Sequence, residues 1–364
     1  MQRLVKGIAL ATIYSGSALA GGVERSAQST AILFESGTYA ELSFAHVSPD
    51  VSGTLAAPAP ALSSGDMLEG YTTTALGFKT ALNEKLDLAL VLDQPIGADV
   101  NYPAGTSYPA RGATATLASD AVTTLLRYEM ASNVSLIGGL RAQRTEGRAN
   151  LPYIPGGYML STSSETDFGY VLGIAWEKPE IAARVSLTYN SAIDHRFSAT
   201  ENGATSLPFT TTIPQSLNLE AQTGIAEDTL LFGSVRWVDW TAFDISPAGY
   251  VAGVGSPLVS YHDDTITYSL GLGRRFNKTW SGAVTLGHEP GVGGFAGNLG
   301  PKDGFTSVGL AATYTRGGVE ITGGARYIWL GDARTESPVT PGATFANFTD
   351  NSGVALGVKV AYTF

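Results

Sequence analysis

Bulky apolar side chains occupy every second position at the C-terminal end of this chain, and small or polar residues stand between them. The apolar set is Val354, Leu356, Val358, Val360, Tyr362 and Phe364. Because successive side chains of a β-strand point to opposite faces, this period predicts a strand with one bulky apolar face and one small or polar face. Such a strand must cover its apolar face, either with a protein core or with lipid.

The same alternation recurs in three other segments, 122–130, 181–190 and 319–329, and their charged residues fall on the face opposite the apolar stripe. In a soluble sandwich the stripe would face a core, whereas in a membrane barrel it faces lipid and the polar face lines the lumen. Aromatic residues near predicted strand ends favour the barrel, because such residues gather at the two membrane interfaces. They are Tyr128, Tyr189, Trp237, Trp280, Trp329 and Tyr362.

The N-terminal residues predict export. Arg3 and Lys6 precede an apolar run over 7–14, and Ala18-Leu19-Ala20 has the small residues of a cleavage site. We therefore expect residues 1–20 to be a cleaved signal peptide. A short membrane anchor is the alternative, but the run is shorter than the roughly 20 residues that span a bilayer. No later window has the roughly 18 consecutive apolar residues of a transmembrane helix.

Composition narrows the class of protein further. Only 15% of the residues are charged and none is cysteine, which excludes a disulfide framework, a thiolate metal site and a cysteine nucleophile. Without residues 1–20 the chain has 20 basic and 32 acidic residues, a net charge of −12, which argues against nucleic acid as a partner. The low charge is typical of a protein with a broad surface facing lipid.

These patterns predict an all-β fold, a transmembrane antiparallel β-barrel of about fourteen strands. Short turns alternate with long connections rich in Gly, Pro, Ser and Thr, which is the layout of bacterial outer-membrane barrels. The barrel must close, because an open sheet would leave unpaired backbone groups in lipid. The predicted strands are 38–50, 70–82, 86–97, 118–130, 134–144, 165–177, 181–191, 215–226, 229–243, 263–276, 279–290, 303–315, 319–330 and 350–364. The final Phe364, with Tyr362 two residues earlier, also resembles the terminal-strand signal for barrel insertion.

Four segments resemble the FadL family of outer-membrane channels for long-chain fatty acids and other hydrophobic compounds. They are Val47-Ser48-Pro49-Asp50-Val51-Ser52-Gly53, Ile213-Pro214-Gln215-Ser216-Leu217-Asn218-Leu219 with Trp237 and Trp240 following, Tyr261-His262-Asp263-Asp264-Thr265, and Gly300-Pro301-Lys302-Asp303-Gly304-Phe305. With the strand layout, the resemblance extends over nearly all of the exported chain. It implies passive uptake, in which outer loops capture the ligand and an N-terminal plug controls a site inside the barrel. An inward kink in the third strand then releases the ligand sideways into the membrane.

The resemblance places the plug at residues 21–37 and the barrel at 38–364. This plug segment is much shorter than a full hatch of the family and lacks the Asn-Pro-Ala element expected there. We therefore predict a reduced plug, and the departure bears on gating by plug movement more than on transport.

The third-strand kink of the family matches residues 92–97. Proline cannot donate a ladder hydrogen bond and glycine allows a bulge, so Pro95 and Gly97 mark either a lateral opening or an ordinary strand end below an outer loop. Two connections, 145–164 and 192–214, carry apolar clusters that predict a capture surface, or loops that fold together as a lid. Their residues are Leu151, Tyr153, Ile154, Tyr158, Met159, Leu160, Phe197, Leu207 and Phe209.

Basic residues fall on the predicted lumen faces of several strands. Each of them would pair with a ligand carboxylate or belong to an Arg–Glu network that braces the lumen, and the sequence leaves both open. The candidates are Arg127, Arg141, Arg184, Arg236, Arg326 and Lys359.

An enzyme is the less favoured interpretation. A general base is most often histidine, and in Asp194-His195 and His262-Asp263 neighbouring side chains on a strand would point to opposite faces. No G-x-S-x-G motif and no metal-ligand spacing is present, so we predict neither catalysis nor a cofactor or metal. A general diffusion porin or a structural barrel is the main alternative, although water-filled porins typically have about 16–18 strands.

We therefore expect a monomeric barrel in the outer membrane of a Gram-negative bacterium. Its expected partners are outer-membrane lipid and a hydrophobic small molecule, with a fatty acid favoured by the family resemblance.

Overall fold

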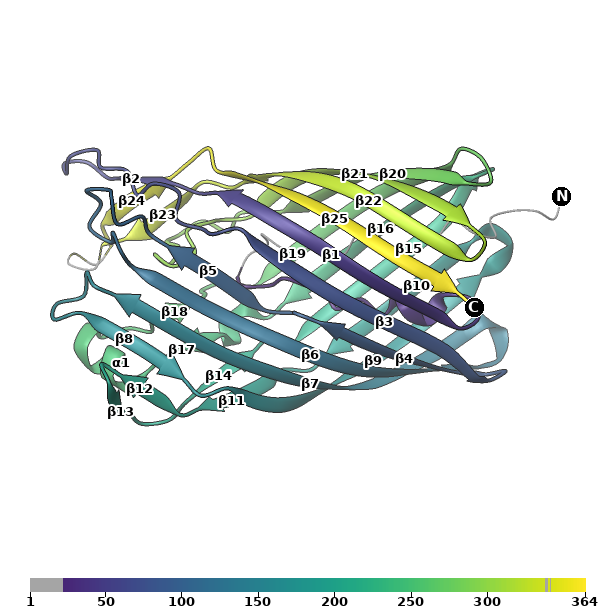
Figure 1. Ribbon diagram of the computed structural model, residues 1–364, viewed down its shortest axis with the longest axis horizontal. Coiled ribbons are helices and arrows are strands. Elements are labelled where there is room, and N and C mark those ends of the chain that lie inside the picture. Colours follow the sequence, from purple (N-terminus) through teal and green to yellow (C-terminus); the bar gives the residue numbers. More distant parts are fainter. Residues whose placement is uncertain (1–21, 338–339, 341) are drawn as a thin grey trace.

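The computed structural model of this protein describes residues 22–337, 340 and 342–364 (Figure 1). The predicted signal peptide, residues 1–20, lies outside the described residues. The chain forms a closed antiparallel barrel, because the first wall strand pairs with the last along its whole length, from Tyr39 opposite Thr363 to Asp50 opposite Ser352. Among the described residues, no helix is both long and apolar enough to cross a bilayer.

Fourteen wall strands follow one another around the barrel, and each pairs with its neighbours in the chain. They are β1 (Tyr39–Asp50), β3 (Tyr71–Asn83), β4 (Leu86–Asp93) continued by β5 (Gly97–Asn101), β6 (Thr114–Glu129), β7 (Val134–Leu151), β9 (Glu165–Lys178), β10 (Ala183–Asn190), β15 (Ser216–Ala226), β16 (Thr229–Val238), β19 (Thr265–Arg275), β20 (Trp280–Glu289), β21 (Phe305–Arg316), β22 (Val319–Leu330) and β25 (Ser352–Thr363). The predicted barrel and its strand number are confirmed.

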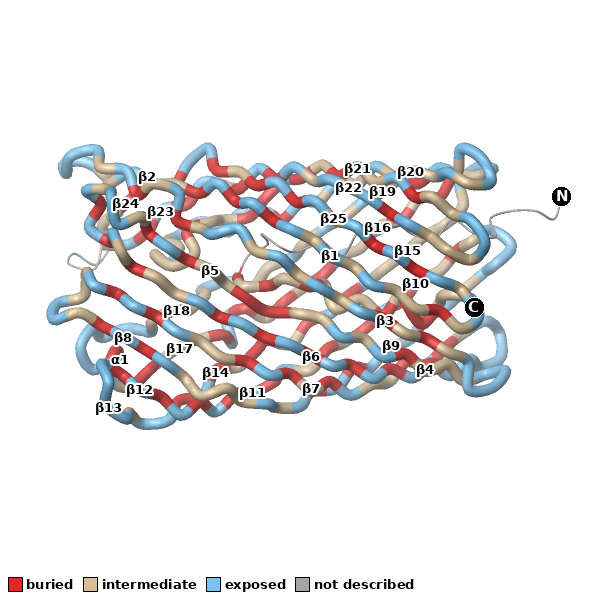
Figure 2. The backbone as a smooth tube through the Cα atoms, viewed as in Figure 1, coloured by how far each residue is buried: buried red, intermediate tan, exposed pale blue. Residues whose placement is uncertain are grey.

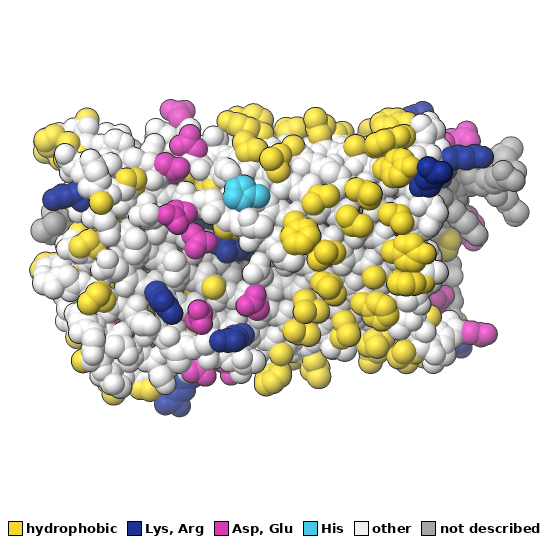
Figure 3. Space-filling model, in the orientation of Figure 1, with side chains coloured by type: hydrophobic (Ala, Val, Ile, Leu, Met, Phe, Trp, Pro, Cys, Tyr) yellow, Lys and Arg dark blue, Asp and Glu magenta, His cyan; other side chains and the backbone are white. Residues whose placement is uncertain are grey.

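The apolar face of each wall strand points outward. On β25, Val354, Leu356 and Val360 are 40%, 56% and 45% exposed, whereas Ala355 and Lys359 between them are buried. Figure 2 shows this alternation of exposed and buried positions along the strands. The outward apolar side chains gather in a belt over the half of the barrel nearer the C-terminus (Figure 3). We call this surface the apolar belt, and it has the placement expected of a lipid-facing surface.

The opposite end of the barrel, away from the C-terminus, is closed by longer connections that contain short elements (Figure 1). One small sheet consists of β2 (Gly53–Leu55), β24 (Thr344–Phe348) and β23 (Ala333–Glu336), and two hairpins consist of β11 (Ile193–Phe197) with β14 (Phe209–Ile213) and β17 (Asp244–Ile245) with β18 (Val259–Ser260). The other elements are β8 (Tyr158–Thr162), β12 (Ala199–Glu201), β13 (Ala204–Thr205), α1 (Ala248–Val254) and the 3-10 turns η1 (Ala31–Phe34), η2 (Ala131–Asn133), η3 (Pro179–Ile181) and η4 (Trp240–Ala242).

Two predicted loops are partly strand. β6 begins at Thr114 and β7 runs on to Leu151, where it pairs with β8. The sequence pattern missed these extensions because their outward residues, such as Arg144 and Arg148, are polar rather than apolar. Beyond the apolar belt a wall strand faces water, so its outer face no longer needs apolar side chains.

The N-terminal segment, residues 22–37, enters the lumen before β1 begins. Ile32 and Leu33 of η1 are buried in a cluster with inward residues of β4, β6 and β7. The Arg127 guanidinium of β6 lies 4.6 Å from the ring of Phe34, and Asn218 of β15 donates a hydrogen bond to the Ala27 carbonyl over 2.9 Å. The segment therefore lies between opposite walls of the barrel and divides the lumen.

Candidate ligand cavity and wall opening

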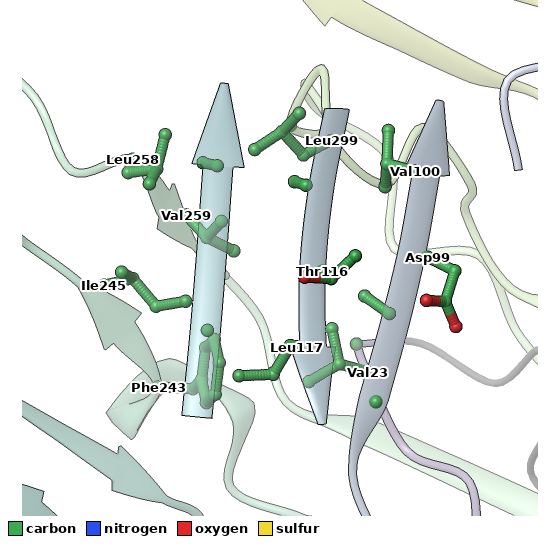
Figure 4. Close-up of a pocket in the computed structure, with 18 of the residues that line it drawn as sticks. Val23, Asp99, Val100, Thr116, Leu117, Phe243, Ile245, Leu258, Val259 and Leu299 are labelled. Atoms are coloured by element: carbon green, nitrogen blue, oxygen red, sulfur yellow. The ribbon is translucent and has the colours of Figure 1, made fainter. Parts of the chain in front are cut away.

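An apolar cavity of about 120 Å³ lies in the lumen on the loop side of the N-terminal segment. Its lining comes from β5, β6, the β11–β14 hairpin and the connection that follows η4. Val23, Leu117 and Phe243 pack together at one end, with Leu258 and Leu299 at the other (Figure 4). Further apolar lining residues are Val100, Leu160, Phe197, Phe209, Ile213 and Ile245. The lining is typical of a site for a hydrophobic small molecule, because such pockets combine apolar walls with few polar groups.

Several charged groups border this cavity, among them Arg25, Asp99, Arg148 and Lys302. Arg25 of the N-terminal segment pairs with Asp99 of β5 at 2.5 Å and lies 3.9 Å above the ring of Tyr71. Lys302, from the connection before β21, borders the same cavity, and no ion pair involves it among the described residues. Burial lowers the pKa of Lys302 to about 8, although nearby Glu289 opposes that shift. Lys302 and Arg148 are therefore cationic groups at the cavity that form no ion pair among the described residues.

The third wall strand is broken directly beneath this cavity. β4 ends at Asp93 and β5 begins at Gly97, so Pro95 and Gly97 lie at the break, as the sequence predicted for an irregular third strand. Pairing of β3 with β4 stops at Leu76 opposite Leu92 and resumes only at the bridge between Leu68 and Val100. Between these points the backbone amide of Thr74 donates a hydrogen bond to Gln94 Oε1 over 3.2 Å, which connects β3 to the broken strand.

A second cavity of about 50 Å³ lies behind this interruption. It reaches inward to Arg141 and Asp93 and outward to Phe44 and Leu76, which are each 44% exposed on the outer face of the wall. The lining therefore includes both lumen-facing and lipid-facing side chains. We call this place the wall opening, defined by residues 70–75 on one side and 93–97 on the other.

The N-terminal segment is hydrogen-bonded to the broken strand. The Gly97 amide donates to the Val23 carbonyl and the Arg25 amide donates to the Pro95 carbonyl, each over 2.8 Å, and Glu24 forms an antiparallel bridge with Ile96. Ser26 Oγ adds a hydrogen bond of 2.6 Å to Asp93. Backbone groups that a continuous strand would pair with β3 are thus paired with the N-terminal segment instead.

Most of the predicted lumen cations belong to the bracing network. Arg127 pairs with Glu177, Arg236 pairs with Glu24, and Lys359 lies 3.2 Å from Glu41. Arg184 lies 4.3 Å from the Phe34 ring and donates to Gln222. Arg326 borders a separate lumen cavity of about 170 Å³ between the N-terminal segment and the β15–β22 wall.

Arg141 differs from these cations. It is 5% exposed, its Nε donates to Thr123 over 2.9 Å, and no ion pair involves it among the described residues. Because it borders the cavity behind the wall opening, its guanidinium is the predicted lumen cation best placed to meet a ligand there.

The predicted capture residues lie in three environments. Leu160, Phe197 and Phe209 are buried and line the apolar cavity. Leu151 and Tyr158 are buried among the outer loops, and Tyr153 and Ile154 pack against the same cluster. Only Met159 and Leu207 are well exposed, at 54% and 71%. These loops thus pack on one another, and three of the predicted capture residues also line the cavity.

Sequence reasoning missed Lys302, Arg25 and Asp99 as cavity residues. Lys302 belongs to a motif that carried the family resemblance, so its position was available, but not its side-chain environment. His195 was considered only with its neighbour Asp194. In the structure it is buried and hydrogen-bonded to Asp167 (Nδ1–Oδ2, 2.9 Å) and Thr145 (Nε2–Oγ1, 3.1 Å), where it connects three strands.

No group of three or more potential ligands in the described residues is placed to hold a metal ion.

Comparison with known proteins finds similarity in structure alone. No protein-family model matches the chain, and no curated protein sequence matches it. A Pseudomonas aeruginosa FadL homologue superposes with a TM-score of 0.75 at 14% identity, over 92% of each chain. The toluene transporter TodX of Pseudomonas putida gives 0.65 at 13% identity over 95% of this chain and 96% of its own. The toluene transporter TbuX of Ralstonia pickettii gives 0.60 at 13% over 92% and 91%. The chain therefore has the FadL-type barrel fold.

Proposed function

We propose that this protein is an outer-membrane channel for the passive uptake of hydrophobic small molecules. The observation that carries the proposal is an apolar lumen cavity that lies directly beside an interruption of the lipid-facing wall. A hydrophobic ligand in this cavity would need to cross only the wall opening to reach the membrane. The fold shared with a FadL homologue and with toluene transporters is consistent with this use.

The cavity accepts a compact apolar group. An engineered apolar cavity of about 150 Å³ in another protein binds benzene, and the cavity here is of similar volume at about 120 Å³. A single aromatic ring fits this size, as does the terminal part of an acyl chain. An acyl chain would place its carboxylate next to Lys302, or next to Arg141 in the cavity behind the wall opening. We therefore propose hydrophobic molecules in general, with long-chain fatty acids as the anionic members of the set.

Capture begins at the outer loops. Met159 and Leu207 present apolar side chains to the outside, and the buried Phe197 and Phe209 continue the apolar path to the cavity. Their rings lie 5.6 Å apart in a tilted arrangement. Ligand entry therefore requires these loops to part, because the aromatic pair and the surrounding cluster fill the route in the closed state.

The hydrogen bonding of the broken strand supports a proposal of lateral release. We propose that the N-terminal segment, residues 22–37, acts as a short plug that stabilises the kink by taking over the backbone groups of Pro95 and Gly97. A ligand that displaces Arg25 from Asp99 would loosen this attachment and widen the wall opening. The short plug thus controls the opening through a few defined contacts rather than through a large folded hatch.

The proposal is tested by closing the wall opening covalently. The chain has no cysteine, so Thr74→Cys with Gln94→Cys provides a unique pair for a short bifunctional crosslinker. Uptake of radiolabelled toluene and oleate is measured in cells carrying crosslinked and uncrosslinked protein. The matched control is Thr80→Cys with Leu88→Cys, which joins β3 to β4 where they are already paired.

Crosslinking is expected to lower uptake at least about tenfold at the wall opening and to leave the control unchanged. Equal uptake through a verified crosslink would rule out lateral release. Rapid swelling of liposomes in sugar solutions, without binding of either hydrophobic compound, would instead identify a general diffusion porin and overturn the channel proposal.

A further inference from the structure

Three arginines project from the outer wall just beyond the apolar belt. Arg144 and Arg148 lie on the outward face of β7, and Arg196 lies on the outward face of β11; all three are exposed. The apolar belt ends at Leu140 on β7 and at Phe168 on the neighbouring β9. These side chains are 69% and 75% exposed. At about 3.3 Å per strand residue, Arg144 lies roughly 13 Å along the strand beyond Leu140. A lipid headgroup would lie near this level if acyl chains cover the apolar belt.

The guanidinium groups of this surface make few polar contacts within the part of the chain that the structure describes. No ion pair involves Arg144, Arg148 or Arg196 among the described residues. Arg144 donates from Nε to Ser164 Oγ over 2.5 Å, which leaves its terminal nitrogens for other partners. Arginines that serve only solubility could occupy any exposed position. These three instead lie together just beyond the apolar belt.

Hydroxyl groups surround the arginines. Ser161 of β8 lies opposite Arg148, and Thr166 of β9 lies opposite Arg144, both with exposed side chains. Serine and threonine hydroxyls donate and accept hydrogen bonds, so this face matches the hydroxyl-rich surface of a sugar. The Ser163 amide donates to the Ser198 carbonyl and the Ser198 amide donates to Ser163 Oγ, which joins the chain after β11 to the connection between β8 and β9. We define the outer arginine surface as Arg144, Arg148 and Arg196 with Ser161, Ser164 and Thr166.

Acidic residues also occur here and must be included. Asp120 lies opposite Arg144 without forming an ion pair and accepts a hydrogen bond from Gln94, and Asp194 accepts one from Thr212. Glu146 lies between Arg144 and Arg148 on the same outward face. Figure 3 shows basic and acidic side chains interspersed beside the apolar belt. A partner must therefore bring separate anionic groups and hydrogen-bond donors, and a uniformly anionic surface would fit less well.

We propose that the outer arginine surface binds the phosphorylated sugar headgroup of the glycolipid that forms the outer leaflet. Its phosphates would each accept paired hydrogen bonds from a planar guanidinium, and its sugar hydroxyls would donate to Glu146 and to the neighbouring hydroxyl groups. Its acyl chains would lie along the apolar belt below. The three side chains are exposed on the outward faces of their strands, and of the three only Arg148 also borders the lumen cavity, so this proposal does not depend on which ligand the lumen carries.

The test compares full-length wild-type protein with an Arg144→Gln, Arg148→Gln, Arg196→Gln variant in mild detergent. Bisphosphorylated lipid A is titrated in, and bound glycolipid is counted by native mass spectrometry. The matched control replaces three exposed arginines elsewhere, Arg111, Arg316 and Arg334, with glutamine. Wild type and control are expected to bind alike, and the triple variant to bind at least about tenfold more weakly.

Parallel titrations identify the chemistry that is recognised. Dephosphorylated glycolipid and phosphatidylglycerol are each expected to bind wild type at least about tenfold more weakly than lipid A. Equal binding of either lipid, or lipid A binding by the triple variant at the wild-type level, would overturn the proposal. If the triple variant does not fold, the three single variants and the triple Arg→Lys variant replace it. The lysine variant keeps the charge but lacks the planar fork, so it is expected to bind with intermediate strength.

Discussion

Glu24 of the N-terminal segment and Arg236 of β16 form a buried ion pair inside the barrel, with Arg236 Nε 3.0 Å from Glu24 Oε1. Glu24 is 5% exposed and Arg236 is 6% exposed. Arg236 also donates to Ser216 and Asn218 of β15. The pair therefore ties a short stretch of irregular chain to the wall opposite the broken strand, and it holds the plug segment across the lumen.

Loss of one partner of this pair should release the plug segment. Removing one member of a buried ion pair generally costs about 3–5 kcal/mol, because the other charge stays buried without a partner. We expect Arg236→Met to increase hydrogen exchange at residues 22–30 by at least about tenfold, while the wall strands keep their protection. Combining Glu24→Gln with Arg236→Met should restore part of the protection. Unchanged exchange in the single variant would show that other contacts hold the segment.

A side chain at position 97 should separate the plug from the kink. A Cβ added at Gly97 would overlap the Arg25 guanidinium, which pairs with Asp99 and lies over Tyr71. We expect Gly97→Val to move Arg25 away and to raise the rate of toluene uptake by several-fold. Gly105→Val is the control, because a Cβ there meets nothing within 4 Å. Uptake equal to wild type would mean that the Arg25 contact does not limit release.

Binding of a carboxylate ligand should depend on pH through Lys302. Its pKa is lowered to about 8, so the ammonium is charged below pH 8 and becomes neutral as the pH rises above it. We expect the affinity for oleate, measured by calorimetry, to fall by roughly tenfold between pH 7 and 9, and the affinity for toluene to stay constant.

Two variants separate the candidate cations. Lys302→Met should abolish the pH dependence of oleate binding, whereas Arg141→Gln should lower affinity equally at both pH values, because arginine stays charged throughout this range. A pH dependence that persists in Lys302→Met would assign it to another group.

Filling the apolar cavity should weaken binding of every hydrophobic ligand. Leu117 lines the cavity from β6, and a larger ring there would occupy part of its volume of about 120 Å³. We expect Leu117→Trp to lower toluene affinity at least about tenfold, measured by equilibrium binding in detergent. Leu140→Trp, on the lipid-facing side of β7, should have no effect. Equal affinity in both variants would place the ligand elsewhere in the lumen.

Much of the fold was predictable because its signal is local. The outward face of β25, from Val354 to Phe364, is visible as a period of two in the sequence. The turns between β6 and β7 at η2, and between β9 and β10 at η3, are visible as short segments between the alternating patterns. The end of β7 beyond residue 144 was not predicted, because its outward positions beyond the apolar belt hold polar residues such as Arg148 instead of apolar ones. The same residues that hid the strand extension are those that form the outer arginine surface.

The site was less predictable because its groups come from distant parts of the chain. Pro95 and Gly97 stand out in the sequence because proline removes a ladder hydrogen bond wherever it stands, and the structure has its strand break at residues 94–96. Their pairing with Val23 and Arg25 could not be read from either segment. The lumen faces of Arg127 and Arg141 were equally visible in the sequence, yet of the two only Arg127 forms an ion pair among the described residues.

By itself, then, the sequence determined a closed barrel with its apolar side outward, because strand periodicity and the need to pair every backbone group in lipid act within and between neighbouring strands. The tertiary structure decided which lumen charges neutralise each other, where the pairing of the third wall strand is interrupted and that Lys302 borders the cavity. Those properties depend on distances across the barrel, and the same alternating strands are compatible with many arrangements of what lies inside them.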